Sequence, residues 1–326
     1  YSTAAMLQEY LDSGDARTLN SEFARVQGTT AYTKEKKQFW RSLQEWNTQL
    51  DPDDRIRVYG IDIEHQLSNS TAYLQHLFRT HSHTEPSNAR GWPALKELQN
   101  KIHEDHELSY GAVETDEWKH LIRQALRELC DQPHAAAGWF GEDRLGLQLV
   151  LQNILYRYEC VEGRTSDQSW NRLRDERIYR NFLALYPSLP KEIRCFGQWG
   201  LNHVFQAEEF GVPWFAARLQ QHRESPLEGE VCSISLIYEQ TNERSKHNQI
   251  TTGFSTYLPE SGAFYHAARW EQTLFSLDED GSPFRSERIW TLTTPRPEMG
   301  VTTDFFQYAI YLRFSPASRG LNQRFY

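Results

Sequence analysis

His203 follows a glycine-rich turn that could present a single imidazole at the end of a strand. Residues 193–199 read as a buried strand, and Gly197 and Gly200 permit a sharp turn or a close approach of the backbone. The exit of a strand is where an open α/β sheet usually places its chemistry. His203 is therefore the first candidate for a general base, an oxyanion donor or a metal ligand. The alternative, a histidine hydrogen-bonded within a loop, stays open.

Asp62 and Glu64 form a second candidate site near the end of a predicted strand over residues 56–63. Two residues apart on a strand, they share one side-chain face, so both are expected to face one cleft and hold a water, a cation or an arginine. Helix capping or a structural salt bridge is the alternative. The partner expected to lower their pKa values is Arg174.

Arg174 is the best anion-orienting group in the sequence. It lies on a predicted helix that leads into the 193–199 stretch. Arg174 and Asn181 are seven residues apart and therefore share a helix face, whereas Asp175 points away from that line. The spacing predicts that Arg174 and Asn181 act on the same side of this helix.

Other histidines suggest a metal site less strongly. His103 and His106 are three residues apart on a predicted helix, but the segment over residues 101–107 is so charged that we interpret it as a solvated face. The sequence contains no HExxH, GxGxxG, Walker or GxSxG motif and no cysteine pair at a zinc spacing. We therefore expect no cofactor and assign no metal ligands, although a divalent metal is compatible with the sequence.

Composition restricts the classes of partner. The 326 residues carry a formal net charge of -9, which disfavours nucleic-acid binding. No stretch approaches the roughly 18 apolar residues that span a bilayer. We expect a soluble protein with a small-molecule substrate. The four widely spaced cysteines leave the compartment open, and the oligomeric state is not indicated.

The elements that must position these residues alternate between strands and long helical stretches. Helices are predicted over residues 3–12, ending at Gly14, and over residues 33–50 and 166–186. Apolar spacing marks two further helices, one through Leu95, Leu98 and Ile102 and one through Ile122, Ala125 and Leu129, and Phe39 and Trp46 share the apolar face of the 33–50 helix. Strands are predicted over 56–63, 193–199, 231–238 and 305–314, and a polar loop over 240–249. This order predicts an α/β fold, in which helices flank a mixed central sheet. We expect one domain over residues 1–326, with a large helical insertion or cap over residues 66–165.

Several short motifs in this order resemble the erythromycin esterase-like superfamily. They are Trp46-Asn47, Val58-Tyr-Gly-Ile-Asp62, Arg174-Asp175-x-x-Ile-x-x-Asn181 and Gly200-x-x-His203. The resemblance runs from about residue 4 to the final predicted strand. More distantly, the pattern is similar to the TraB and Tiki-type metalloproteases and the ChaN-like proteins.

The resemblance implies a catalytic chemistry. In that family a histidine and glutamates act on a water that attacks an ester, and His203 matches the histidine of the later strand. The family usually has His-Asn-x-His there, and Gly200 stands in place of the first histidine. The family's Gly-Glu-x-x-His motif and a second strand that ends in glutamate precede a segment resembling residues 6–14. We therefore expect further strands upstream of Tyr1.

The resemblance and the candidate residues together predict a hydrolase that attacks an ester or related acyl bond in a cleft under the helical cap. His203 would stabilise or protonate the reacting oxygen, Arg174 would hold a substrate oxygen, and Asp62 or Glu64 would orient these groups. Residues expected to contact substrate are Asp175, Asn181, Gln198, Gly200 and Asn202. Two alternatives stay open: a non-catalytic binding or effector module, and a Tiki-like metal-dependent peptidase.

Overall fold

The computed structural model describes residues 1–27, 29–86, 91–103, 114–245, 249–255, 263–286 and 300–321. The chain separates into two compact units. Unit 1 contains Tyr1–Arg25 and Leu43–Leu189, and unit 2 contains Val26–Ser42 and Pro190–Tyr326. Each unit has a hydrophobic core of its own.

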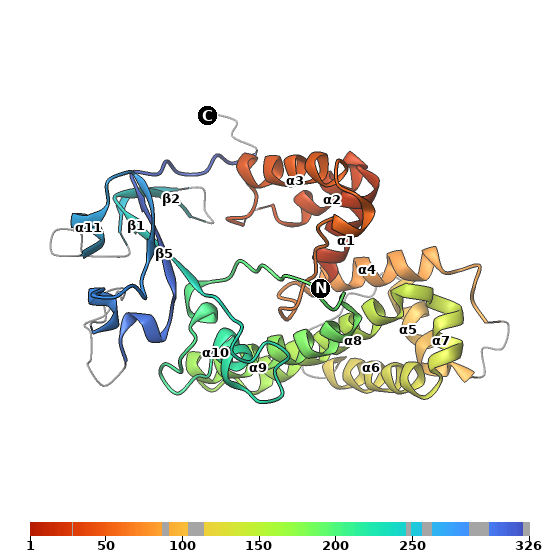
Figure 1. Cartoon of the computed structure of the whole chain (residues 1–326). Coiled ribbons are helices and arrows are strands. Elements are labelled where there is room, and N and C mark those ends of the chain that lie inside the picture. The colour runs from red at the N-terminus through yellow and green to blue at the C-terminus, as the bar shows by residue number, and fades with distance from the viewer. Residues whose placement is uncertain are drawn as a thin grey trace. The chain divides into compact units, whose positions relative to one another are not determined.

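Unit 1 is built mainly of helices (Figure 1). The α-helices are α1 (Ser2–Ser13), α2 (Ala16–Arg25), α4 (Leu67–Thr80), α5 (Pro93–His103), α6 (Glu114–Asp131), α7 (Pro133–Phe140), α8 (Arg144–Glu162) and α9 (Asp167–Leu185), and α3 (Lys34–Asn47) begins in unit 2 and ends in unit 1. Helix α1 packs against α2 and α4, α5 packs against α4 and α6, and α8 packs against α6 and α9. Short 3₁₀ helices are η1 (Pro52–Asp54), η3 (Gly141–Asp143) and η4 (Tyr186–Ser188).

Local signals explain where two of these helices begin and end. Helix α1 stops at Gly14, whose φ of 69° is left-handed and whose N–H donates to the Tyr10 carbonyl over 2.8 Å. Helix α9 begins with a reciprocal cap, because the Ser166 hydroxyl accepts from the Ser169 N–H and the Ser169 hydroxyl accepts from the Ser166 N–H. The predicted helix that ends at Gly14 is confirmed.

Apolar residues at helical spacing form the core of unit 1. Leu95, Leu98 and Ile102 are fully buried on α5, and Ile122, Ala125 and Leu129 are fully buried on α6. The three-and-four spacing of these residues predicted both helices, and each buries the predicted face.

Unit 2 holds the described strands. Strand β5 (Tyr308–Arg313) lies between β1 (Ile234–Glu239), which is parallel to it, and β4 (Gln272–Ser276), which is antiparallel. A separate antiparallel pair joins β2 (Thr241–Arg244) to β3 (Ile250–Phe254). The remaining elements are α10 (Phe215–Gln221), α11 (Ala263–Ala267), η5 (Leu201–Val204), η7 (Pro283–Arg285) and η9 (Thr302–Asp304). The helices and this mixed sheet confirm the α/β class with a large helical portion.

The strand predicted over residues 56–63 is wrong. This segment is extended, yet it pairs with no strand among the residues that the structure describes. Side chains supply the backbone hydrogen bonds that a neighbouring strand would provide. The Asn47 amide binds both the N–H (2.7 Å) and the carbonyl (3.1 Å) of Ile56, and Gln8 Oε1 accepts from the Val58 N–H over 2.7 Å. A β-prone sequence therefore does not become a strand here.

The strand predicted over residues 193–199 is also wrong. Within the described residues this stretch pairs with no strand, and most of its side chains are exposed, with Phe196 at 91%.

Two further expectations need correction. The polar segment 240–249, predicted as a loop, contains β2, and residues 246–248 lie outside the described residues. Helix α3 forms as predicted, but Phe39 (58%) and Trp46 (51%) on its apolar face are exposed.

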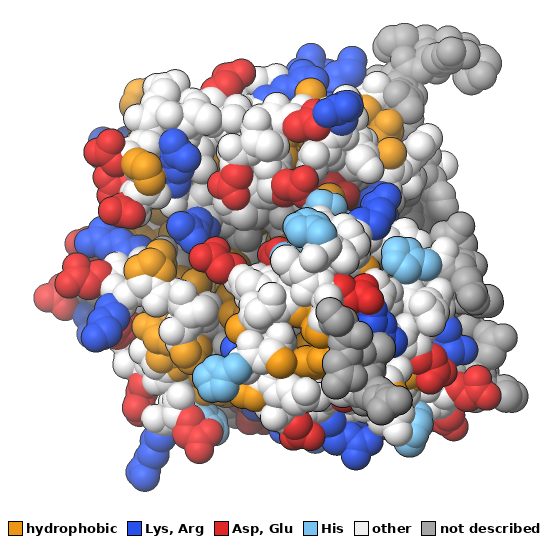
Figure 2. Space-filling model, turned by 90° about the vertical axis from the view of Figure 1, so that its right-hand side faces the viewer, with side chains coloured by type: hydrophobic (Ala, Val, Ile, Leu, Met, Phe, Trp, Pro, Cys, Tyr) orange, Lys and Arg blue, Asp and Glu red, His pale blue; other side chains and the backbone are white. Residues whose placement is uncertain are grey.

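Figure 2 shows acidic and basic side chains interspersed over the face that it draws. Among the described helices, none combines the length and apolar character that a membrane crossing requires. Unit boundaries do not decide the domain count, so one domain with a helical insertion over residues 66–165 stays a prediction.

Candidate functional site

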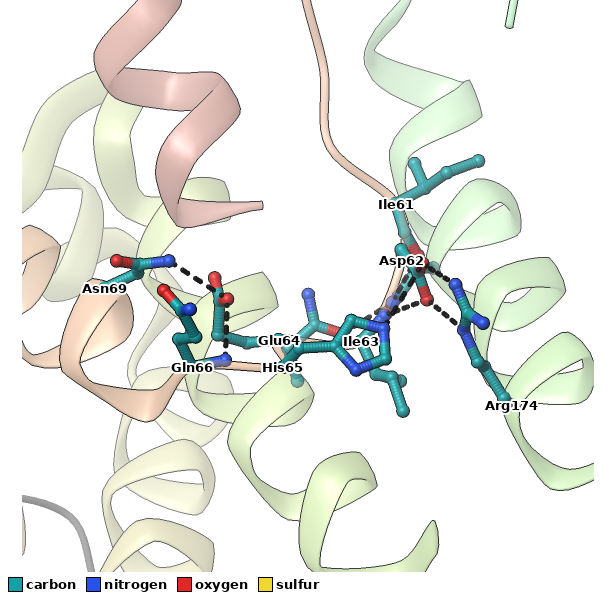
Figure 3. A network of polar contacts seen from close by, with 10 residues as sticks. Ile61, Asp62, Ile63, Glu64, His65, Gln66, Asn69 and Arg174 are labelled. Carbon is teal, nitrogen blue, oxygen red and sulfur yellow. Dashed lines mark hydrogen bonds and ion pairs between the residues drawn. The ribbon is translucent and has the colours of Figure 1, made fainter. Parts of the chain in front are cut away.

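Asp62 and Arg174 form a two-pronged ion pair within unit 1 (Figure 3). Arg174 projects from α9, and its Nε donates to Asp62 Oδ1 over 2.9 Å while its Nη2 donates to Oδ2. The two residues are 112 positions apart in the sequence, and their side chains are 30% and 20% exposed. The paired geometry fixes the plane of the guanidinium as well as its position. The predicted partnership of these residues is present.

The electrostatics keep both groups ionised. Burial opposes ionisation of Asp62, but the hydrogen bonds from Arg174 and His65 and the charges of both outweigh it, so the pKa of Asp62 lies well below its ordinary value. Burial alone would lower the pKa of Arg174, yet the hydrogen bonds and charge of Asp62 raise it overall. His65 Nε2 lies 3.8 Å from Asp62 Oδ2.

Asn181 holds the backbone next to Asp62. Two helical turns after Arg174, its Nδ2 donates to the Ile61 carbonyl over 2.8 Å and to Asn153 Oδ1 on α8. Asn181 is 2% exposed, as is Asn153. Arg174 and Asn181 therefore act on the same short segment from one face of α9, as their spacing predicted. Asn153 was not among the candidate residues, because an asparagine within an apolar helix carries no signal of its partner.

Glu64 has different partners from Asp62. Its Oε1 accepts from the Gln66 N–H (3.1 Å) and from Asn69 Nδ2 (3.3 Å) at the start of α4. In Figure 3 these bonds lie on the opposite side of the segment from Arg174. The expected common face is absent because the alternation of side chains holds only in a strand, and this segment is not one. Glu64 instead makes capping contacts, which were the alternative to a site role.

His203 lies in unit 2, on the 3₁₀ helix η5, and is 8% exposed. Its backbone N–H donates to the Gly200 carbonyl over 3.0 Å. Its ring packs against Trp199, with centroids 6.1 Å apart, and edge-on against Trp214 at 5.8 Å and 89°. Sequence reasoning missed these two tryptophans, although Trp199 lies within the same turn.

The glycines of this turn have unequal roles. A Cβ on Gly197 would lie 2.3 Å from the Trp199 indole nitrogen, so the indole can pack there only because residue 197 is glycine. Gly200 has more space, because a Cβ there would lie 3.6 Å from its nearest neighbour, a carbon of the His203 ring. The expected close approach of the backbone therefore occurs at Gly197.

The remaining candidates divide by exposure. Gln198, Gly200 and Asn202 are exposed in unit 2, whereas Asp175 is fully buried in unit 1. Within the described residues, no three histidine, cysteine, aspartate or glutamate side chains lie close enough to hold a metal ion. His106 falls outside those residues, so the metal interpretation of His103 and His106 stays untested.

Comparisons with known proteins place the chain in a family. Residues 1–194 of its 326 match the family model described as erythromycin esterase. A solved Bacillus cereus protein superposes with a TM-score of 0.69 at 14% identity, covering 99% of this chain and 80% of that one. A solved succinoglycan biosynthesis protein superposes with a TM-score of 0.62 at 12% identity, covering 98% of this chain and 79% of that one. No curated protein matches. At these identities the two structures support the fold, while the family match covers more than half of the chain: the protein belongs to the erythromycin esterase family.

Proposed function

We propose that the protein is a hydrolase in which water attacks an ester or a related acyl bond. The proposal rests on the family match over residues 1–194, which contains the Asp62–Arg174 pair. A preorganised cation suits this chemistry, because ester hydrolysis develops negative charge on the carbonyl oxygen. The reaction cleft would be bordered by the helices of residues 66–165.

Arg174 is the proposed oxyanion or carboxylate ligand. Arginine has five N–H donors, and Asp62 engages two nitrogens of the guanidinium, so donors on the same plane are left for substrate. Asp62 would hold this plane, and Glu64 would hold the start of α4 next to it. The buried Asn181 and Asp175 would act by positioning the segment and the helix.

His203 is the proposed proton-transfer residue. Its packing against two tryptophans restricts the ring, which favours a defined direction for its nitrogens. The exposed Gln198, Gly200 and Asn202 are the proposed substrate contacts of unit 2.

Hydrolysis assays on a panel of nitrophenyl esters and lactones would test the proposal. We expect His203→Ala to lower kcat/KM by about 100-fold or more, the scale of general acid–base catalysis. His222→Ala, an exposed histidine of the same unit, is the matched control and should leave turnover unchanged. Circular dichroism would verify that both variants fold.

Other outcomes would contradict the proposal in distinct ways. Equal turnover of His203→Ala and the parent would remove His203 from the mechanism. Peptide hydrolysis that a chelator abolishes would instead indicate the Tiki-like peptidase. Binding of esters without turnover would indicate a non-catalytic module.

A further inference from the structure

A pocket of about 490 Å³ opens in unit 1 between α1, α4 and the extended residues 58–59. Its lining contains neither Asp62 nor Arg174 nor His203. The pocket therefore has its own chemistry, which can be considered apart from the proposed hydrolysis.

Acidic side chains dominate the charge of this pocket. Glu9 and Asp12 come from α1 and Asp143 from η3, and no lysine or arginine is among the described residues that line it. Glu9 Oε2 lies 3.4 Å from His76 Nε2. Asp143 Oδ2 lies 2.9 Å from His81 Nε2. A histidine carries charge only when protonated, so neither contact pairs Glu9 or Asp143 with a permanent cation.

The phenols of Tyr1 and Tyr73 lie near these carboxylates. Burial raises the pKa of the Tyr1 phenol to about 12, and the negative charge of Asp143 contributes to the rise. Burial also raises the pKa of Tyr73, and among the additional causes are the charges of Asp143 and Glu9. Each carboxylate disfavours a second negative charge, as it would favour a positive one.

The walls are aromatic and apolar as well as acidic. The rings of Tyr1 and Tyr73 meet edge-on, with centroids 6.0 Å apart at 68°. The half-exposed Tyr59 and the side chains of Met6 and Leu77 also line the pocket. Aromatic rings attract cations that are only weakly hydrated, and apolar walls accommodate their carbon substituents.

We infer that this pocket binds an organic cation, a tertiary or quaternary amine, between the carboxylates of Glu9 and Asp143 and the tyrosine rings. A bare metal ion fits less well. Within the described residues, no three potential ligands gather closely enough to coordinate one, and a metal ion has no use for apolar walls. A phosphate or carboxylate ligand would meet three acidic groups.

Choline and its neutral isostere 3,3-dimethylbutan-1-ol provide the test, with binding to the whole protein measured by isothermal titration calorimetry. The two probes match in shape and differ in charge. We expect choline to bind about tenfold more tightly, and its affinity to fall as salt rises from about 20 mM to about 300 mM. Equal affinity for the two probes, or no measurable binding of choline, would overturn the inference.

Variants locate the site. Glu9→Gln and Asp143→Asn should each weaken choline about fivefold, and Tyr59→Leu should weaken choline more than the isostere. Glu117→Gln removes an exposed carboxylate on α6 outside the pocket and should bind like the parent. Thermal unfolding would verify that each variant is folded. Parent-like binding by Glu9→Gln and Asp143→Asn would place the choline elsewhere and overturn the inference.

Ester hydrolysis serves as a separate readout. Glu9→Gln should retain the turnover of the parent while binding choline about fivefold more weakly. Failure of the hydrolase proposal would leave the choline result unaffected, and failure of the choline test would leave the role of His203 unaffected.

Discussion

Residues 56–66 in unit 1 and residues 191–203 in unit 2 have similar sequence patterns and different structures. Both join an apolar stretch to a polar candidate residue, and neither forms a strand among the described residues. Side chains from three helices hold the first segment by its backbone, whereas the second is largely exposed until η5. The contrast shows that polar partners at a distance, rather than local β propensity, fix an extended segment.

The largest effect that would test this contrast is expected for Arg174. Arg174→Ala leaves the partly buried Asp62 without its arginine partner. We expect a loss of about 2–3 kcal/mol in the free energy of unfolding, which lies between the values for exposed and buried ion pairs. Arg194→Ala, an exposed arginine of the second segment, should change it by less than about 0.5 kcal/mol. Urea denaturation measures both, and equal losses would contradict the contrast.

The next largest effect on the free energy of unfolding is expected for one of two asparagine substitutions. Asn181→Ala removes the hydrogen bond to the carbonyl of the half-buried Ile61 and should cost about 1–2 kcal/mol, because that acceptor loses its donor. The exposed Asn202→Ala should be near neutral. Urea denaturation measures both variants. Equal free energies of unfolding would contradict the prediction and would show that the hydrogen bond from Asn181 to the Ile61 carbonyl contributes little to stability.

Stability at acidic pH isolates the charge of Asp62. Its folded-state pKa lies below the unfolded value of about 3.9, so its contribution is complete above that pH and is lost as the pH falls towards the folded pKa. Asp62→Asn should therefore be less stable than the parent near neutral pH, by about 1 kcal/mol, and the difference should shrink below pH ~4. Thermal unfolding across this range measures the difference, and a constant gap would show that the ionised carboxylate is not responsible.

The smallest effect is expected at Phe196, which is 91% exposed. Phe196→Ala should change the free energy of unfolding by less than about 0.5 kcal/mol, because it removes little buried surface. Guanidinium denaturation would detect a loss above about 1 kcal/mol, and that result would mean the second segment is covered in solution.

Helices with a regular apolar period were predictable from sequence, and so were two strands of the sheet. Leu95, Leu98 and Ile102 repeat at helical spacing, and Gly14 marks the end of α1, because both signals are local. Strands β1 and β5 fall within the segments predicted at 231–238 and 305–314, except that β1 extends one residue further. Segments 56–63 and 193–199 failed because a strand needs a hydrogen-bonded neighbour, which propensity does not reveal.

The candidate site was predictable only in part. Opposite charge suggested the Asp62–Arg174 pair, and helix spacing placed Asn181 on the same face. The direction in which the Glu64 side chain points depends on the backbone conformation of residues 62–66. The sequence pattern predicted a strand there, and the predicted direction was therefore wrong. Outside the candidate site, Gln206 and Gln307 of unit 2 exchange two 2.8 Å hydrogen bonds between their side-chain amides. The sequence does not indicate this pairing, because a glutamine that is exposed to solvent looks the same in the sequence.

The amides that hold residues 56–61 also imply an order of assembly. Asn47 reaches Ile56 across 9 residues, whereas Asn181 reaches Ile61 across 120. Closing the longer loop costs roughly 2 kcal/mol more in chain entropy than closing the shorter one. The segment should therefore become fixed first at Ile56 and last next to Asp62, so the site residue would take its position only once α9 has docked.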